Sequence, residues 1–447
     1  MDFFKKITDP VFYVTNDVTR GIGIENLLPN YHIVCLDDHP LVDYLVEAGI
    51  KVFCLEKVLR ERNKIFRSTS RIIDHPLVLE YIKKESKEEI PNILFFKPSA
   101  KIDFVCQKYG FLKIGNSAKI NRIFEDKVSF YEICRKEKLP VPEGETEILA
   151  NLDFQKLKEK YNLPLVIQFG RGWAGNTTFF IDSDQRFSLL KRQFGNKKVK
   201  ITRFILGKTV LNNACVYNKK ILVSPPAQQI EATLGLTSLP AATCGRQWPA
   251  ELEEGQIEQI NRITEEVGKI MDRNGYKGFF GLDFIVERST GKIFLSEDNA
   301  RLTASVPFFT KLEQNFGQIP MLLYHLSAFN YRFSLDNSPY LLPEIEGSEI
   351  VVRNDRQKPV KVKGKIFPGI YHFLEGKLVF LRPDYFPKNL KKDEFWLSTS
   401  FQGRIVNPEQ ELAKIDFNHK VLDKEGKILK NFKNLASLIK MKLELEE

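Results

Sequence analysis

The polar side chains best spaced to do chemistry lie on two short apolar segments on either side of the turn 287–292. Alternate residues of a strand share one face, so Glu297, Asn299 and Arg301 can point in the same direction. A hairpin register that pairs the two segments can bring Asp283 beside them. Three oxygen ligands and one guanidinium suit Mg²⁺ bridging polyphosphate oxygens, with the arginine next to a developing negative charge. The same residues also fit an ordinary hairpin with a polar edge.

The whole string 281–303 resembles the metal-binding strand pair of ATP-grasp enzymes, in which G-x-D/E-F is followed by E-x-N-x-R. Asp283, Glu297, Asn299 and Arg301 occupy its four functional positions. The trailing arginine is most similar to the branch that contains biotin carboxylase and carbamoyl phosphate synthetase. The resemblance implies two Mg²⁺ ions, for which Mn²⁺ can substitute, held by the carboxylates and the amide. It also implies that Arg301 stabilises a phosphorylated intermediate.

Upstream of this hairpin, Asp126 and Lys127 open a predicted helix that stops before Pro140 and Pro142. The two prolines end the helix and favour extended chain. The order D-K followed by L/V-P-x-P resembles the start of the ATP-grasp module. This resemblance implies that Lys127 contacts the phosphates of ATP, whereas the residue pattern alone also fits a lysine on a helix surface.

A glycine-rich loop at 170–178 follows the apolar strand 165–169. Glycines let backbone N–H groups approach phosphate oxygens and form an anion-binding nest. ATP-grasp enzymes use such a loop as a lid over ATP, and the simpler alternative is a hairpin turn. The residues that we expect at the phosphates are Gln168, Gly170, Arg171, Gly172 and Gly175.

The segment 199–207 resembles the adenine hinge strand V-x-V-E-E-(Y/F)-I-x-G of the same family. The resemblance implies that backbone groups near Arg203 and Ile205 pair with the adenine edge and that Phe204 packs nearby. Without the resemblance, the segment is simply a β-strand.

Two positions depart from the family pattern. Gln168 stands where the family has a lysine, and Thr202 stands where it has a glutamate. An amide carries no charge to neutralise phosphate, and a lost charged contact costs about 1.5–3 kcal/mol. Such a loss weakens ATP binding roughly tenfold or more. The two departures therefore call nucleotide affinity into question.

The segment 224–249 is rich in proline and glycine and has few periodic apolar positions, so we expect loops. In related ligases such loops line the acceptor side. Glu231 and Arg246 are therefore candidates for binding the amine and the carboxylate, and Arg246 is a candidate catalytic residue. A surface loop with ordinary charges is an equally good description.

The first 125 residues alternate strand and helix patterns, which is typical of βαβ units and a parallel sheet. Gly21 and Gly23 follow the first strand, but Asn26 replaces the third glycine of a dinucleotide fingerprint. We expect a helix near 24–28, another at 251–273 and a last one at about 434–445. The predicted fold is α/β (α+β), with a Rossmann-like pre-grasp domain at 1–125, an ATP-grasp domain at 126–330 with its lid at about 145–205, and a small β-rich domain at 331–447.

Composition narrows the class of protein. The chain has 447 residues, 43% of them apolar, and a formal charge of +10. Its lysines and arginines are scattered among acids, so we expect a solvated basic surface or a basic cleft for ATP, and no nucleic-acid partner. The six cysteines form no CxxC pair, which argues against structural zinc and for a reducing compartment. No apolar run approaches 18 residues and no signal peptide is recognisable, so we expect a cytoplasmic protein with no membrane partner.

Together these patterns predict an ATP-dependent ligase that activates a small carboxylate as an acyl phosphate and joins it to an amine. The β-rich region suggests packing, substrate closure or a homodimer. A second hypothesis is a nucleotide-binding or regulatory protein with a decayed site, which Gln168 and Thr202 favour and the intact quartet opposes. A dinucleotide oxidoreductase is a third, and the broken glycine pattern opposes it.

Overall fold

Five N-terminal strands form a parallel sheet, because helices, or a long loop with a 3-10 turn between β1 and β2, return the chain between successive strands. The strand order is β3-β2-β1-β4-β5. The strands are β1 (Val11–Thr15), β2 (Tyr31–Cys35), β3 (Lys51–Cys54), β4 (Asn92–Phe95) and β5 (Leu112–Ile114). Their connections contain the 3-10 turn η2 (Val18–Arg20), α1 (Pro40–Glu47), α2 (Leu55–Leu59), α3 (Thr69–Ile73), α4 (Pro76–Ser86) and α5 (Ala100–Tyr109). The computed structural model describes residues 7–171, 177–329, 334–336, 338, 340, 344–386, 390–391 and 393–447.

A four-stranded antiparallel sheet with the order β6-β9-β7-β8 forms the region in which we expect the lid. Helices α6 (Ala118–Glu125) and α7 (Lys127–Lys136) lead into it. Its elements are β6 (Gly144–Ile148), η3 (Leu149–Asn151), α8 (Phe154–Tyr161), β7 (Leu165–Phe169), β8 (Thr178–Ile181), α9 (Asp184–Phe194) and β9 (Lys198–Arg203). Buried side chains of α8 and α9, such as Leu157 and Phe187, pack against Ile167 and Ile201 of the sheet.

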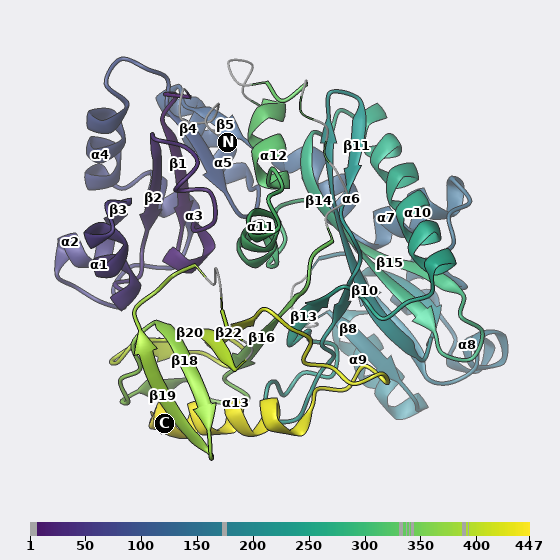
Figure 1. The fold of residues 1–447 in the computed structure, drawn as a ribbon. Coiled ribbons are helices and arrows are strands. Elements are labelled where there is room, and N and C mark those ends of the chain that lie inside the picture. The colour runs from purple at the N-terminus through teal and green to yellow at the C-terminus, as the bar shows by residue number, and fades with distance from the viewer. Residues whose placement is uncertain are drawn as a thin grey trace.

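A large antiparallel sheet of eleven strands joins the middle of the chain to its C-terminal part (Figure 1). Its order is β15-β14-β10-β12-β13-β16-β22-β20-β18-β19, and β11 pairs with β10. The strands are β10 (Gly207–Tyr217), β11 (Lys220–Val223), β12 (Ala227–Gln229), β13 (Gly245–Trp248), β14 (Gly278–Glu287), β15 (Ile293–Asn299), β16 (Gly347–Arg353), β18 (Gly369–Leu374), β19 (Lys377–Arg382), β20 (Glu394–Thr399) and β22 (Glu411–Phe417). The domain boundaries given above remain predictions, and this one sheet runs across the last of them.

A small sheet closes the C-terminal part of the chain. It consists of β17 (Val360–Val362) between β21 (Ile405–Val406) and β23 (Leu445–Glu446). The last helix, α13 (Lys430–Lys442), begins four residues before the predicted start. Helix α10 (Glu254–Arg273) agrees with its prediction, since a capping box starts it and Gly275 with φ +79° follows it. The predicted helix near 24–28 is wrong, because this segment forms only turns.

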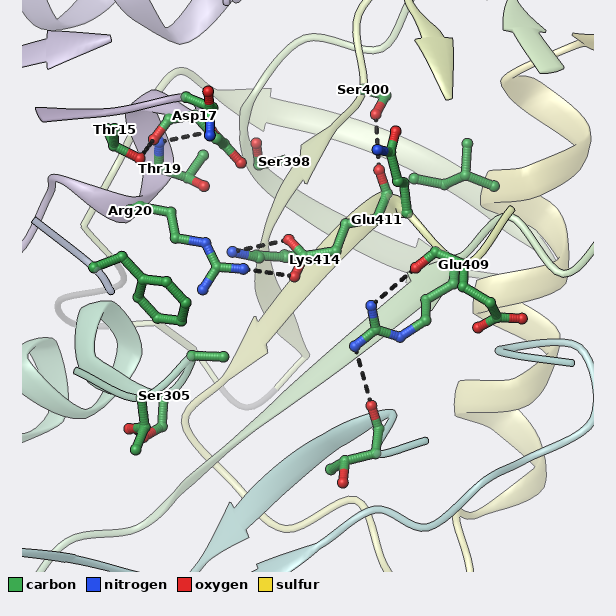
Figure 2. A pocket seen from close by; sticks show the side chains of 18 of the residues that line it. Thr15, Asp17, Thr19, Arg20, Ser305, Ser398, Ser400, Glu409, Glu411 and Lys414 are labelled. Atoms are coloured by element: carbon green, nitrogen blue, oxygen red, sulfur yellow. Dashed lines mark hydrogen bonds and ion pairs between the residues drawn. The ribbon is translucent and has the colours of Figure 1, made fainter. Parts of the chain in front are cut away.

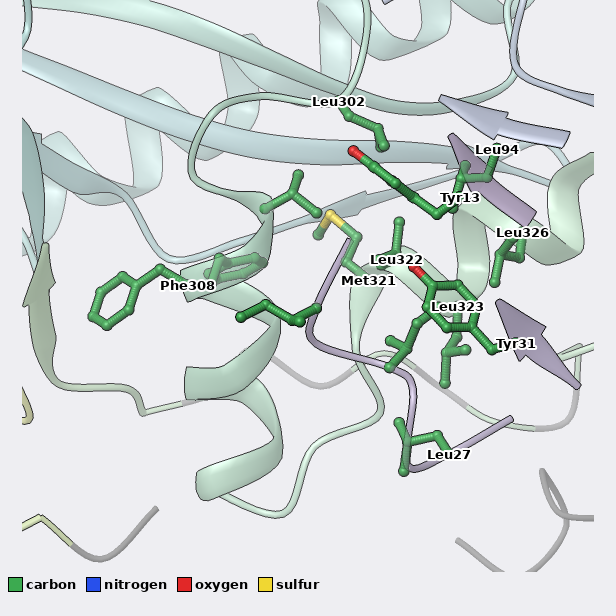
Figure 3. Packing of buried hydrophobic residues seen from close by; sticks show 14 of the residues in the cluster. Tyr13, Leu27, Tyr31, Leu94, Leu302, Phe308, Met321, Leu322, Leu323 and Leu326 are labelled. Atoms are coloured by element: carbon green, nitrogen blue, oxygen red, sulfur yellow. The ribbon is translucent and has the colours of Figure 1, made fainter. Parts of the chain in front are cut away.

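Two helices lie between the N-terminal parallel sheet and the large sheet: α11 (Val306–Asn315) and α12 (Met321–Phe329) (Figure 1). Figure 3 shows their apolar side chains, among them Phe308, Met321 and Leu326, beside Tyr13 and Leu94 of the parallel sheet. This shared cluster fixes the N-terminal sheet relative to the strands that carry the candidate site. The predicted α/β fold class is thus confirmed.

No helix in the described ranges combines the length and the apolar character needed to cross a membrane. All six cysteines are buried and unbridged. The structure therefore assigns them to packing, because a buried thiol behaves as a small apolar side chain.

Candidate active site

The four predicted side chains of the metal strand pair do come together. Strands β14 and β15 are antiparallel, with Asp283 opposite Glu297 and a bulge directly after Asp283. Asn299 Nδ2 donates to Asp283 Oδ2 at 3.0 Å, and Arg301 Nη2 donates to Asn299 Oδ1 at 2.9 Å. We call Asp283, Glu297, Asn299 and Arg301 the quartet. The convergence of Asp283, Glu297 and Asn299 follows from the two-residue period of β15 and from the hairpin register, and Arg301 lies just beyond the end of β15.

The two carboxyl groups of the quartet have different electrostatic surroundings. Burial, together with the charge of Glu297, raises the pKa of Asp283 to about 7. Burial alone would also raise the pKa of Glu297, but the charge and hydrogen bond of Lys127 outweigh it and hold that pKa below its usual range. The Lys127 ammonium donates directly to the Glu297 carboxylate. The pair therefore holds one negative charge firmly on Glu297, and the raised pKa of Asp283 makes its carboxyl the more readily protonated of the two.

This donor set fits a magnesium ion. Mg²⁺ prefers oxygen ligands, and a divalent cation would favour the ionised form of Asp283 beside Glu297. In the described part of the chain, no three His, Cys, Asp or Glu side chains cluster closely enough to hold a metal. The quartet instead offers two carboxylates and an amide, which leaves room for water and phosphate oxygens as further ligands.

Arg301 is held in place from several sides. Its Nε donates to Glu125 Oε1 at 3.0 Å, and Lys97 Nζ lies 2.6 Å from the same oxygen. Burial opposes ionisation of Glu125, but Arg301 and Lys97 outweigh it and lower the pKa of Glu125 to about 2. The Arg301 guanidinium also stacks 4.9 Å above the ring of Phe96. These contacts orient the guanidinium in advance of any reaction.

The start of α7 is tied to the glycine-rich loop. Asp126 caps the helix by accepting from the N–H groups of Val128 and Ser129. The Lys127 N–H donates to the Gly170 carbonyl at 2.9 Å. A Cβ on Gly170 would clash with the Asp126 carboxylate, so a larger residue here would displace the group that caps α7. Of the other predicted loop residues, Arg171 is exposed, and Gly172 and Gly175 lie outside the described residues.

The predicted nucleotide residues on the strands have protein partners. Gln168 is buried, and its Nε2 donates to Thr178 Oγ1 at 3.1 Å. Arg203 Nη1 donates to Glu287 Oε1 at 2.8 Å. Phe204 packs edge-on against Phe180, with 5.7 Å between ring centroids. Ile205 is buried. That these residues contact ATP remains a prediction.

A polar cavity of about 760 Å³ opens directly from the quartet. Its walls come from the loop after β1, from β13 and β16, and from β20 and β22 with their adjoining loops. Figure 2 shows Glu411 between Arg20 and Lys414, at 2.9 Å and 3.2 Å. Burial opposes ionisation of Glu411, but Lys414 and Arg20 outweigh it and hold its pKa well below the usual range.

Several cavity-lining side chains have buried polar atoms without a hydrogen-bond partner among the described residues. These atoms are Asn16 Oδ1, Thr19 Oγ1, Arg20 Nη1, Arg246 Nε and Nη1, Arg353 Nε and Thr399 Oγ1. A buried polar atom without a partner is unfavourable. The cavity is also lined by many charged and hydroxyl side chains, and this lining suits a polar ligand. Sequence analysis identified only Arg246 of this set, because the other residues belong to no recognisable motif.

Arg246 lies on β13 and lines the cavity. Its side chain is 8% exposed, and Nη1 lies 3.2 Å from Glu349 Oε1 without hydrogen-bond alignment. The guanidinium is therefore charge-balanced by Glu349 and lies against the cavity. Glu231, the predicted amine ligand, does not line the cavity, and its carboxylate accepts from the Thr209 N–H.

No protein-family model and no curated protein matches the sequence. Solved structures do match. Biotin carboxylase from Campylobacter jejuni aligns at 13% identity and a TM-score of 0.61 over 92% of this chain and 88% of that chain. N5-carboxyaminoimidazole ribonucleotide synthetase from Thermotoga maritima aligns at 14% identity and a TM-score of 0.54 over 98% of this chain and 99% of that chain.

A third match is the biotin carboxylase domain of 2-oxoglutarate carboxylase from Hydrogenobacter thermophilus, solved with MgADP, ADP and bicarbonate. It aligns at 13% identity and a TM-score of 0.60 over 92% of this chain and 86% of that chain. These likenesses establish a shared fold. The chain has the ATP-grasp fold, as its motifs predict. The motif on which that prediction rests forms strands β14 and β15, where the quartet lies.

Proposed function

We propose that this protein is an ATP-dependent ligase that phosphorylates a small carboxylate and joins the activated acyl group to an amine. The observation that carries the proposal is the continuity of the quartet with a polar cavity lined by the side chains of Arg20, Arg246 and Arg353. Phosphate-handling groups and a polar substrate pocket thus share one space. The fold that the chain shares with biotin carboxylase and N5-carboxyaminoimidazole ribonucleotide synthetase supports the same class of reaction.

In the first step, a carboxylate oxygen of the substrate attacks the γ-phosphorus of ATP, and ADP leaves. Arg246, whose side chain lines the cavity, binds the carboxylate. Mg²⁺, when held by Asp283, Glu297 and Asn299, supplies positive charge that neutralises the polyphosphate. Lys127 and the loop near Gly170 bind the phosphates, and the segment from Arg203 to Ile205 binds adenine.

In the second step, the amine attacks the acyl carbon, phosphate leaves, and the nitrogen loses a proton. Arg301 donates to the oxygens that gain negative charge in both steps. Its guanidinium lines the cavity and is already oriented by Glu125, so little reorganisation is needed at the moment of reaction. No nucleophilic side chain takes part, because positioning and electrostatic stabilisation supply the catalysis.

A nucleotide-binding protein with a decayed site is the second candidate, and the uncharged Gln168 and Thr202 favour it. Thermal melting with ATP, with and without Mg²⁺, tests for nucleotide binding. A ligand at about 100 times its Kd adds roughly 2.7 kcal/mol, which raises Tm by a few degrees. A Mg²⁺-dependent rise followed by ADP release in a screen of carboxylates and amines supports the ligase. A rise without ADP release for any pair supports the binding protein, and no rise at millimolar ATP contradicts both.

A further inference from the structure

Lys200 is a buried lysine that the mechanism above does not use. It lies on β9 directly opposite Gln168 of β7, and Thr146 of β6 flanks it on the other side. Residues paired directly across neighbouring strands project from the same face of the sheet. The Lys200 side chain therefore projects from the same face of the sheet as Gln168. Position 168 is where the family pattern has a lysine and this chain has an uncharged amide.

The surroundings of the Lys200 ammonium lead toward the quartet. Only 2% of the residue is exposed, and Nζ donates to the Ser296 carbonyl of β15 at 3.0 Å. Nζ also lies 5.3 Å from the centre of the Tyr131 ring of α7. Ser296 immediately precedes Glu297, so Lys200 approaches the candidate metal strand from the lid side. Lys127 lies on α7, as Tyr131 does, and its ammonium binds the Glu297 carboxylate.

The charges at this place do not balance. In the described part of the chain, Lys200 has no carboxylate within ion-pair distance, and the Glu297 carboxylate is already bound by Lys127. Burial and the charge of Lys127 lower the pKa of Lys200 to about 8. Two buried ammonium groups thus face one firmly ionised carboxylate. A bound polyphosphate would supply the missing negative charge, since buried charges are stable only when they are paired.

We propose that Lys200 binds the phosphate groups of the nucleotide and replaces, from the neighbouring strand, the lysine that is absent at position 168. This inference rests on the proposed function, because it needs a nucleotide between the four-stranded sheet and β15. The proposal explains how the nucleotide site can be retained although position 168 is glutamine. The positive charge comes from Lys200 on β9 and not from position 168 on the neighbouring strand β7. The competing explanation is that Lys200 only fixes β9 to β15 through the Ser296 carbonyl.

Three variants separate these explanations: Lys200→Gln, Gln168→Lys and the double variant with both changes. Affinities for ADP with Mg²⁺ and for adenosine are measured by calorimetry or by competition. Lys200→Gln is expected to weaken ADP at least about tenfold and to leave adenosine unchanged, because only ADP has phosphates. The double variant is expected to recover most of the ADP affinity, because it returns a lysine to the same face one strand away.

Lys191 supplies a matched control, because its Nζ also donates to a backbone carbonyl, that of Leu152, at 2.7 Å within the same subdomain. Lys191→Gln should change neither affinity. Equal weakening of ADP and adenosine in Lys200→Gln, or no recovery in the double variant, would overturn the phosphate assignment in favour of a structural role. Unchanged ADP affinity in Lys200→Gln would also overturn it while leaving the ligase proposal intact. If the unaltered protein binds no nucleotide, both proposals fail.

Discussion

The quartet and the cavity wall share one space but are built in different ways. Three of the four quartet residues lie within five positions of one another, and Asp283 joins them across a single hairpin. The cavity wall combines residues from distant parts of the chain: the loop near Arg20, Arg246 and Arg353, and Glu411 and Lys414. Arg20 and Lys414 lie almost 400 positions apart. One region is a local motif, and the other exists only after the large sheet has assembled.

The difference teaches where chemistry and selectivity are encoded. A hairpin register is a short-range property, so a ligand set on it keeps a readable spacing. The cavity wall depends on the order β13-β16-β22-β20, which no single segment specifies. Under the proposed function, the quartet would serve the phosphate chemistry, and side chains on distant strands would set the substrate. The predictions below test whether the two regions have these separate roles.

The largest effect is expected from Glu297→Gln. The amide keeps the shape of the side chain but removes the charge that binds Lys127 and the cation, so turnover should fall about a thousandfold. ADP release at saturating ATP is the measurement. Asp182→Asn, which breaks an exposed ion pair with Arg186, is the control and should keep normal turnover. Normal turnover in Glu297→Gln would mean that the quartet is only a hairpin with a polar edge.

Glu125 joins the two regions, because it binds Arg301 of the quartet and Lys97 of the cavity wall. Its pKa is about 2 in the fold, against 4.5 in the unfolded chain. The unfolded state therefore binds the proton first, and the contribution of Glu125 to stability is present above pH 4.5 and is lost as the pH falls toward 2. The full contribution is on the order of 3 kcal/mol.

Urea unfolding at several pH values measures this contribution. The stability difference between the unaltered protein and Glu125→Gln should be largest at neutral pH and should shrink steadily below pH 4.5. Glu258→Gln, on the exposed face of α10, is the control and should give a small difference that does not change with pH. A difference that stays constant down to pH 3 would show that Glu125 does not link the regions by its charge.

The sequence predicted what short-range geometry controls. It predicted alternating strands and helices with a parallel sheet in the first 125 residues, helix α10, and the convergence of Glu297, Asn299 and Arg301, since each follows from a local pattern. It did not predict that Lys200 stands opposite Gln168, because the pairing of β7 with β9 brings together residues 32 positions apart. The helix predicted at 24–28 is absent. There the Gly23 N–H donates to the Glu25 carboxylate in a turn, and the spacing of apolar residues does not reveal this contact.

A smaller effect is expected from Arg246→Lys, which probes the cavity wall. Lysine keeps the positive charge beside Glu349 but loses the planar fork that suits a carboxylate. The KM for the carboxylate substrate should rise about tenfold, and the KM for ATP should stay the same. Arg273→Lys, exposed on α10, serves as the control. An equal rise in both KM values would place Arg246 on the nucleotide side and break the separation of roles.

The smallest effect is expected from Phe96→Leu, which tests how tightly the two regions are coupled. The Phe96 ring lies 4.9 Å from the Arg301 guanidinium and 4.8 Å from that of Arg20. Leucine keeps an apolar contact but removes the aromatic face, at a cost of about 1 kcal/mol, so kcat/KM should fall roughly fivefold. Phe104→Leu, exposed on α5, should change nothing.

The division of that loss between kcat and KM shows which of the two guanidinium groups Phe96 acts through. A fall in kcat alone would mean that Phe96 acts through Arg301 and belongs to the quartet. A rise in the KM for the carboxylate alone would mean that it acts through Arg20 and belongs to the cavity wall. A change in both, with coupling between Phe96→Leu and each of Arg301→Lys and Arg20→Lys in double-mutant cycles, would show that one ring positions both guanidinium groups and that substrate binding and phosphate chemistry are linked there.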